Sequence, residues 1–161
     1  MSTTDIYAVT KKSCNCIGKV SNAHRGAMYV WNDIAKRYFN LDGFPLFDRE
    51  MQRRVWNAEN EHELPKHEEI VLAATMDRVT VKQADIKKLT DAFDKYGYEH
   101  PNSSISEQSK IINSYEFKPD ELLAFNQTSA SEFQFEPSYS EDDEEEYSQL
   151  ESAWDLFEQL S

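Results

Sequence analysis

The acidic side chains of this 161-residue chain are concentrated at one end. Residues 119–161 contain 13 of the 30 Asp and Glu residues and no Lys or Arg, whereas residues 1–118 hold all 17 basic residues and 17 acids. The first part of the chain is therefore neutral, and the last quarter carries the whole formal net charge of −13. This segregation indicates that the neutral part supplies the folded core and that the acidic part is an interaction surface.

The composition limits the classes of partner. Apolar residues make up 39% and aromatic residues 12% of the chain, which is enough for one domain with a real core and excludes general disorder. The excess negative charge would repel nucleic acids and anionic membranes. We therefore expect no nucleic acid and no membrane as a partner, and we expect instead a protein with a basic surface.

Hydrophobic periodicity predicts an α+β fold, with a small sheet and three to four helices followed by an acidic C-terminal helix. Residues 5–20 are typical of a strand that leads into a loop or hairpin. Apolar residues at helical spacing predict a helix that starts near Ser21 or Asn22 and ends near Asn40, and a shorter helix from about Asp48.

The second half of the chain is predicted in the same way. The stretch EEIVLAATMDRVTV favours a strand, although its first half is also compatible with a helix. VKQADIKKLTDAFDKYG predicts a helix that ends at Gly97, and another helix is expected from about Ser106 to Tyr115. The alternation of Phe133 and Phe135 predicts an extended segment. We place the boundary between a neutral α+β domain, residues 1–137, and an acidic amphipathic helix or tail, residues 138–161.

The C-terminal segment has one apolar face if it is helical. Large side chains recur there at steps of three and four residues, which is the helical spacing: Tyr147, Leu150, Trp154, Phe157 and Leu160. An isolated helix of this length is marginal in water. We therefore expect this face to pack against the body of the protein, a second copy in a homodimer, or a partner.

The acids of this segment are the candidate partner-binding residues: Glu141, Asp142, Asp143, Glu144, Glu145, Glu146, Glu151, Asp155 and Glu158. If residues 140–158 form one helix of roughly 30 Å, their nine carboxylates match the roughly nine phosphates that one DNA strand presents over the same length. A DNA mimic that inhibits a restriction enzyme, a CRISPR effector, a nuclease or a DNA-repair protein is therefore an alternative function.

No catalytic motif accompanies these features. The chain lacks nucleotide-binding glycine patterns and a G-x-S-x-G nucleophile elbow. Cys14, Cys16 and His24 offer three potential metal ligands at an unfamiliar spacing, and the C-x-C spacing is too tight for an ordinary disulfide. We expect no cofactor, no metal and no enzymatic activity. A small enzyme with a site near these three residues and Arg25 is the remaining alternative.

Two cysteines and no signal-peptide or membrane-spanning run predict a reduced, cytoplasmic protein. In length, mass and the stretches SNAHRGAMYVWNDIAKRYF and EEIVLAATMDRVTVKQADIKKL, the chain resembles the T-even phage inhibitors of the bacterial ATP-dependent protease Lon. This resemblance implies a non-enzymatic protein in the host cytoplasm that binds a hexameric protease and blocks proteolysis. We also expect that a chain cut after Pro137 keeps its body folded and inhibits less well.

Overall fold

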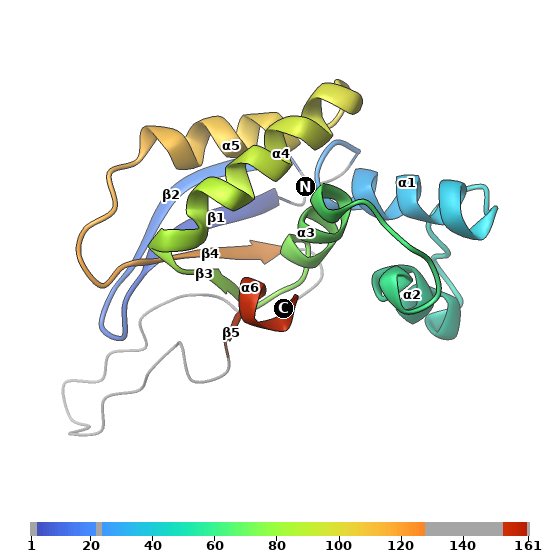
Figure 1. The fold of residues 1–161 in the computed structure, drawn as a ribbon, viewed down its shortest axis with the longest axis horizontal. Helices are drawn as coiled ribbons and strands as arrows, with labels where there is room; N and C mark the ends of the chain where they lie inside the picture. The colour runs from blue at the N-terminus through green and yellow to red at the C-terminus, as the bar shows by residue number, and fades with distance from the viewer. Residues whose placement is uncertain (1–2, 22–23, 128–152, 161) are drawn as a thin grey trace.

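The computed structural model describes residues 3–21, 24–127 and 153–160, which form a five-stranded mixed sheet with helices packed against it (Figure 1). The strands are β1 (Thr3–Val9), β2 (Cys14–Ser21), β3 (Val79–Val81), β4 (Leu122–Gln127) and β5 (Trp154–Asp155). Their order is β2-β1-β4-β3-β5, and all neighbours are antiparallel except β3 and β5, which are parallel. The fold is α+β, so the predicted class is confirmed.

The described residues form six α-helices: five before the C-terminal helix, where three to four were expected, and the C-terminal helix itself. They are α1 (Ala27–Phe39), α2 (Arg49–Trp56), α3 (Lys66–Ala74), α4 (Ile86–Glu99), α5 (Ile105–Ser114) and α6 (Leu156–Gln159), with short 3-10 turns η1 (Ala58–Asn60) and η2 (Gln83–Asp85). Helices α4 and α5 lie side by side over one face of the sheet, and α3 packs against α4 (Figure 1). Helices α1 and α2 lie together at the other end of the molecule from the β1–β2 turn.

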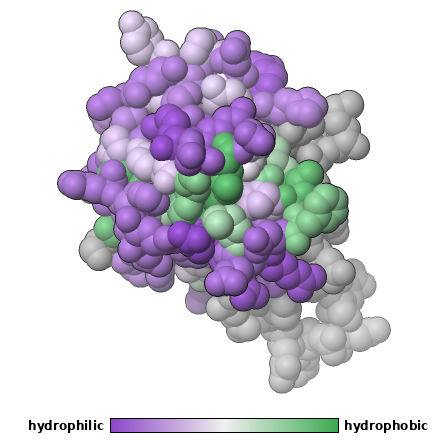
Figure 2. Space-filling model, turned by 90° about the vertical axis from the view of Figure 1, so that its right-hand side faces the viewer, coloured by the Kyte–Doolittle hydropathy of each residue, from purple (hydrophilic) through white to green (hydrophobic). Residues whose placement is uncertain are grey.

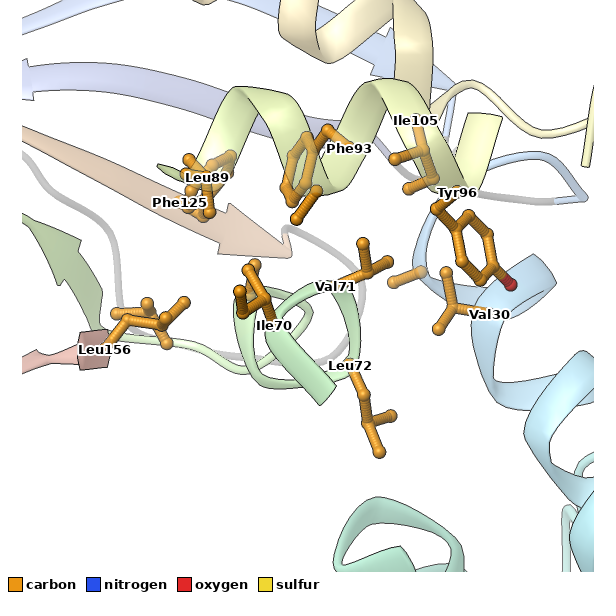
Figure 3. Close-up of a cluster of buried hydrophobic side chains, with 14 of the residues drawn as sticks. Val30, Ile70, Val71, Leu72, Leu89, Phe93, Tyr96, Ile105, Phe125 and Leu156 are labelled. Atoms are coloured by element: carbon orange, nitrogen blue, oxygen red, sulfur yellow. The ribbon is translucent and has the colours of Figure 1, made fainter. Parts of the chain in front are cut away.

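The main core lies between the sheet and helices α3 and α4 (Figure 3). Leu89 and Phe93 of α4 lie over Phe125 of β4, and the ring centroids of the two phenylalanines are 5.9 Å apart. Ile70 of α3 and Leu156 of α6 extend this core toward the C-terminus. Full burial of each such side chain stabilises the fold by about 1.5–3 kcal/mol.

Several local predictions are confirmed. The hairpin β1–β2 occupies the N-terminal stretch, and α1 ends at Asn40, which adopts the left-handed conformation with φ 54°. Helix α2 starts after Asp48, whose side chain accepts a hydrogen bond from the backbone N–H of Met51 at 3.1 Å. Helix α5 ends at Ser114, one residue before the predicted end. These elements could be predicted from the sequence because apolar spacing and capping residues are local signals.

The preferred strand in EEIVLAATMDRVTV is wrong for its first half, which forms α3. Pro65 precedes this helix, and Glu68 and Glu69 lie in its first turn, where negative charge favours a helix. Four of the five residues in its apolar run IVLAA are buried, and a run buried on all sides lacks the periodicity that separates helix from strand. Only Val79–Val81 is extended, after a turn in which Arg78 has a φ of 66°.

Gly97 does not end α4, which continues to Glu99. A Cβ at this glycine would lie 2.7 Å from the Cβ of Ser106, so the residue permits close contact between α4 and α5. The expected extended segment at Phe133 and Phe135 falls outside the described residues. The observed strand β4 lies just before it and was not predicted.

None of the helices in the described ranges is both long and apolar enough to span a lipid bilayer.

Candidate functional site

The C-terminal residues belong to the sheet and the core. Trp154 and Asp155 form β5, which pairs in parallel with Val79 and Thr80 of β3. The short helix α6 follows, and the side chain of Asp155 accepts hydrogen bonds from the backbone N–H groups of residues 157 and 158, both at 3.0 Å. Leu156 is fully buried. A C-terminal helix is therefore present, and the strand β5 directly before it joins it to the sheet.

The predicted apolar face does not continue through one helix. Trp154 lies on a strand, whereas Phe157 lies on α6 and Leu160 directly follows it. All three side chains are half-buried and pack against the core, although they come from two different elements. Tyr147 and Leu150 lie outside the described residues. Periodicity identified residues that pack but assigned the wrong backbone conformation at Trp154, since β5 depends on pairing with distant β3.

Two of the predicted partner-binding acids have contacts within the protein. The Nζ of Lys82 lies 2.7 Å from Glu158 Oε1 and 3.9 Å from Asp155 Oδ2. Hydrogen bonding to Glu158 is the main reason that the pKa of Lys82 is raised. The other predicted acids lie outside the described residues: Glu141, Asp142, Asp143, Glu144, Glu145, Glu146 and Glu151. For those seven residues, partner binding stays a prediction.

The structure does not bring Cys14, Cys16 and His24 together in a metal site. Cys14 and Cys16 lie at the start of β2, with no disulfide among the described residues, and His24 lies beyond the far end of that strand. Within the part of the chain that the structure describes, none of the three belongs to a group of potential metal ligands. Arg25 forms an ion pair with Glu107 of α5. The constellation suggested for a small enzyme is therefore not one site, and the expectation that the protein is not an enzyme stays a prediction.

A buried ionic cluster between α1, α3 and α4 was not found from the sequence. Arg37 donates to both carboxylate oxygens of Asp33, at 2.8 and 2.6 Å, and also forms an ion pair with Glu68. The side chain of Glu68 is only 3% exposed. The hydrogen bond to Asp33 is the main reason that the pKa of Arg37 is raised. The four-residue spacing of Asp33 and Arg37 could have indicated an ion pair along one helix. Glu68 is 31 residues from Arg37, so its contact could not be read from the sequence.

Aromatic side chains complete this cluster. The hydroxyl of Tyr96 donates to Asp33 Oδ2 at 2.9 Å, and that of Tyr38 donates to Glu68 Oε2 at 2.9 Å. Burial is the main cause that raises the pKa of both tyrosines, and the carboxylate beside each contributes further. The ring of His100 stacks on Tyr96 with centroids 4.2 Å apart. The cluster therefore joins three helices, and its carboxylates already have hydrogen-bond and ion-pair partners inside the protein.

This cluster is also the place where the described residues could best hold a metal ion. Asp33, Glu68 and His100 each offer one ligand atom, and these atoms lie within 4.8 Å of one another. However, the guanidinium of Arg37 already contacts both carboxylates. A cation would have to displace this positive group, so the arrangement fits a structural ion-pair network better than a metal centre.

A pocket of about 560 Å³ lies between α2, α3 and the C-terminal residues. Its lining combines aromatic and aliphatic side chains with a few polar ones, and includes the indoles of Trp56 and Trp154 and the carboxylate of Glu59. Figure 2 shows hydrophobic side chains exposed among hydrophilic ones at the end of the molecule where α1 and α2 lie. Sequence reading did not find the pocket, because its walls are about 100 residues apart in the chain.

Comparisons with known proteins found no matching family model, no similar curated protein and no similar solved structure.

Proposed function

We propose that this protein is a non-enzymatic inhibitor that binds a basic surface of another protein through its acidic C-terminal quarter. We further propose, from the resemblance in sequence, that the target is a hexameric ATP-dependent protease of the Lon type in the host cytoplasm. The observation that carries the proposal is the charge segregation. Residues 119–161 hold 13 acids and no base, and the rest of the chain is neutral.

Ion pairs within the body support this reading. Many of its acids have a basic partner inside the body, as in the pairs Lys19–Asp5, Arg25–Glu107, Arg37–Glu68, Arg54–Glu61 and Lys87–Asp91. In the acidic quarter, the ion pairs that the described residues show are those of Asp155 and Glu158, and both use Lys82. Because the body holds as many acids as bases, it has no excess positive charge to neutralise the C-terminal quarter, and a basic partner would complement that quarter.

The acidic stretch is attached to the sheet on both sides. Residue 127 ends β4 and residue 154 begins β5, and both strands are neighbours of β3. The points where the chain leaves and rejoins the described body on either side of this stretch are therefore fixed by the sheet. The same attachment supports resistance to unfolding, since β5 and the buried Leu156 must first leave the core.

The DNA-mimic alternative has less support. Its charge spacing assumed one helix from residue 140 to residue 158, and Trp154 and Asp155 are extended. Recovery of a DNA-binding enzyme from bacterial lysate, in place of a protease, would refute the proposed target.

The experiment is an inhibition assay with a matched pair of charge variants. A Lon-type protease degrades an unfolded substrate with ATP while the protein is titrated in. In one variant Glu144, Glu145 and Glu146 become Gln, and in the control variant Glu50, Glu63 and Glu116 become Gln. Each variant removes three negative charges, and the three control side chains are exposed on the body.

We expect the acidic-segment variant to inhibit about tenfold less well, because three exposed charge contacts contribute about 0.2–1 kcal/mol each. The control variant should inhibit like the wild type, and added salt should weaken inhibition by wild type more than by the acidic-segment variant. Equal loss in both variants would refute the role of the C-terminal quarter. Absence of inhibition, with recovery of a DNA-binding enzyme from bacterial lysate, would refute the target.

A further inference from the structure

We propose that the pocket between α2, α3 and the C-terminal residues receives an arginine side chain of the basic partner. This inference rests on the proposed function, since it assumes a partner with a basic surface, and it adds a defined contact point outside the acidic stretch. The pocket has a volume of about 560 Å³. Sites for small ligands commonly measure about 300–1,000 Å³, so one long side chain and part of its backbone fit inside.

One wall of the pocket is the indole of Trp56, at the end of α2. Its ring packs against two other aromatic rings that do not line the pocket: Trp31 at 5.5 Å and Phe44 at 5.4 Å between centroids. Phe44 is itself fixed, because its backbone N–H donates to Asn32 Oδ1 at 2.7 Å. The wall therefore keeps its position without a ligand, and little side-chain entropy is lost on binding.

Trp154 also lines the pocket, and the sheet positions it. Its backbone N–H donates to the carbonyl of Arg78 at 3.0 Å, and its own carbonyl accepts from the hydroxyl of Thr80 at 3.1 Å. Two indoles on rigid elements thus line one pocket. Indole faces attract cations more strongly than other aromatic faces, and this is how aromatic cages bind ammonium and guanidinium groups.

The charges around the pocket favour a cation. Glu59 lines the pocket, is exposed, and has no ion pair among the described residues. Trp154 itself belongs to the acidic quarter, whose excess negative charge attracts a cation. Lys66 is a basic residue beside this region, and its Nζ lies 3.3 Å from the carbonyl of Leu160, which lines the pocket, and 3.8 Å from Glu69. These two oxygens partly neutralise it.

The two indoles and the carboxylate of Glu59 favour arginine over lysine. The guanidinium is planar, stacks on aromatic rings and is less strongly hydrated than an ammonium, so it loses less on entering an aromatic pocket. It can also donate to Glu59 in a forked arrangement while it lies against an indole. We therefore expect arginine to bind better than lysine, and an uncharged isostere of arginine not to bind.

The experiment titrates full-length protein with a capped peptide, Ac-Gly-Arg-Gly-NH₂, and follows the indole N–H signals by ¹H–¹⁵N NMR. The three tryptophans give separate reporters. Trp31 Nε1 donates to Thr75 Oγ1 at 2.8 Å, whereas Trp56 Nε1 is buried and has no acceptor among the described residues, so their signals should differ. Trp31 packs behind the pocket wall and serves as the internal control. The matched control peptide replaces arginine with citrulline, which has the same shape without the charge.

We expect the arginine peptide to shift the signals of Trp56 and Trp154 in the millimolar range and to leave Trp31 nearly unchanged. Glu59→Gln should weaken the binding about fivefold, and Glu63→Gln, on an exposed side chain that does not line the pocket, should not. Lys66→Gln should strengthen it. Equal shifts with citrulline, no shift, or equal shifts of all three indoles would each overturn the proposal.

The two proposals fail in different ways. If the peptide binds the pocket but the protein does not inhibit the protease, the pocket stands and the proposed function fails. If the protein inhibits the protease but the peptide causes no shift and Glu59→Gln leaves inhibition unchanged, the function stands and the pocket proposal fails.

Discussion

The buried Leu156 gives a direct test of whether the C-terminus belongs to the folded body. This side chain is fully buried on α6 and packs in the main core (Figure 3). Truncation of a buried leucine to alanine costs about 2–5 kcal/mol, through lost burial and the cavity that remains. Helix α6 has only four residues and adjusts more easily than a long helix, so we expect about 2–3 kcal/mol for Leu156→Ala.

The assay is urea unfolding of the full-length protein, followed by circular dichroism and tryptophan fluorescence. With a denaturant dependence of about 2 kcal/mol per molar, the midpoint should fall by about 1–1.5 M at an unchanged slope. The melting temperature should fall by about 4–12 °C. Leu46→Ala is the matched control, because Leu46 is 63% exposed, and it should change the free energy of unfolding by less than about 0.5 kcal/mol.

If Leu156→Ala were no more destabilising than Leu46→Ala, the C-terminal residues would not belong to the core, and the sheet pairing of Trp154 would be in doubt. The same reasoning reverses the expectation for a chain cut after Pro137. Such a cut removes β5 and Leu156, so we now expect the remaining body to lose at least as much stability as Leu156→Ala does.

Three further outcomes are expected. Arg37→Met leaves the buried carboxylate of Glu68 and the half-buried carboxylate of Asp33 without their cation. It should cost about 2 kcal/mol by urea unfolding, less than the loss of a fully buried ion pair, because the Arg37 side chain is 39% exposed; the exposed Arg53→Met should cost almost nothing. Burial, followed by the neighbouring carboxylate, raises the pKa of Tyr96, so above pH 10 the unfolded state loses this proton first. The free energy of unfolding should then fall by up to about 1.4 kcal/mol per pH unit from this group, and Tyr96→Phe should make the fall shallower, whereas an unchanged slope would contradict the buried position. Gly97→Ala should destabilise by about 1–3 kcal/mol in thermal melts although alanine favours helices, because its Cβ meets Ser106; a more stable variant would mean that α4 and α5 are not in close contact.

Local sequence signals accounted for much of the fold. The apolar spacing of α1, the cap at Asp48 and the β-branched N-terminal stretch predicted a helix, a helix start and a hairpin, and the structure has all three. These features depend on residues a few positions apart, so their physics is visible in the sequence. The charge segregation is likewise a property of the sequence alone, as is the resulting expectation of a basic partner.

Contacts between distant residues decided the rest. Helix α3 could not be told from a strand because its apolar residues are buried on every side. Trp154 has helical spacing with its neighbours, yet it is extended because Val79, 75 residues earlier, offers it a sheet edge. The Arg37 cluster and the pocket between Trp56 and Trp154 also join distant segments. The sequence by itself determined which residues are apolar, charged or helix-forming, whereas only the tertiary structure decided which of them meet, because pairing and packing between remote segments depend on the whole fold.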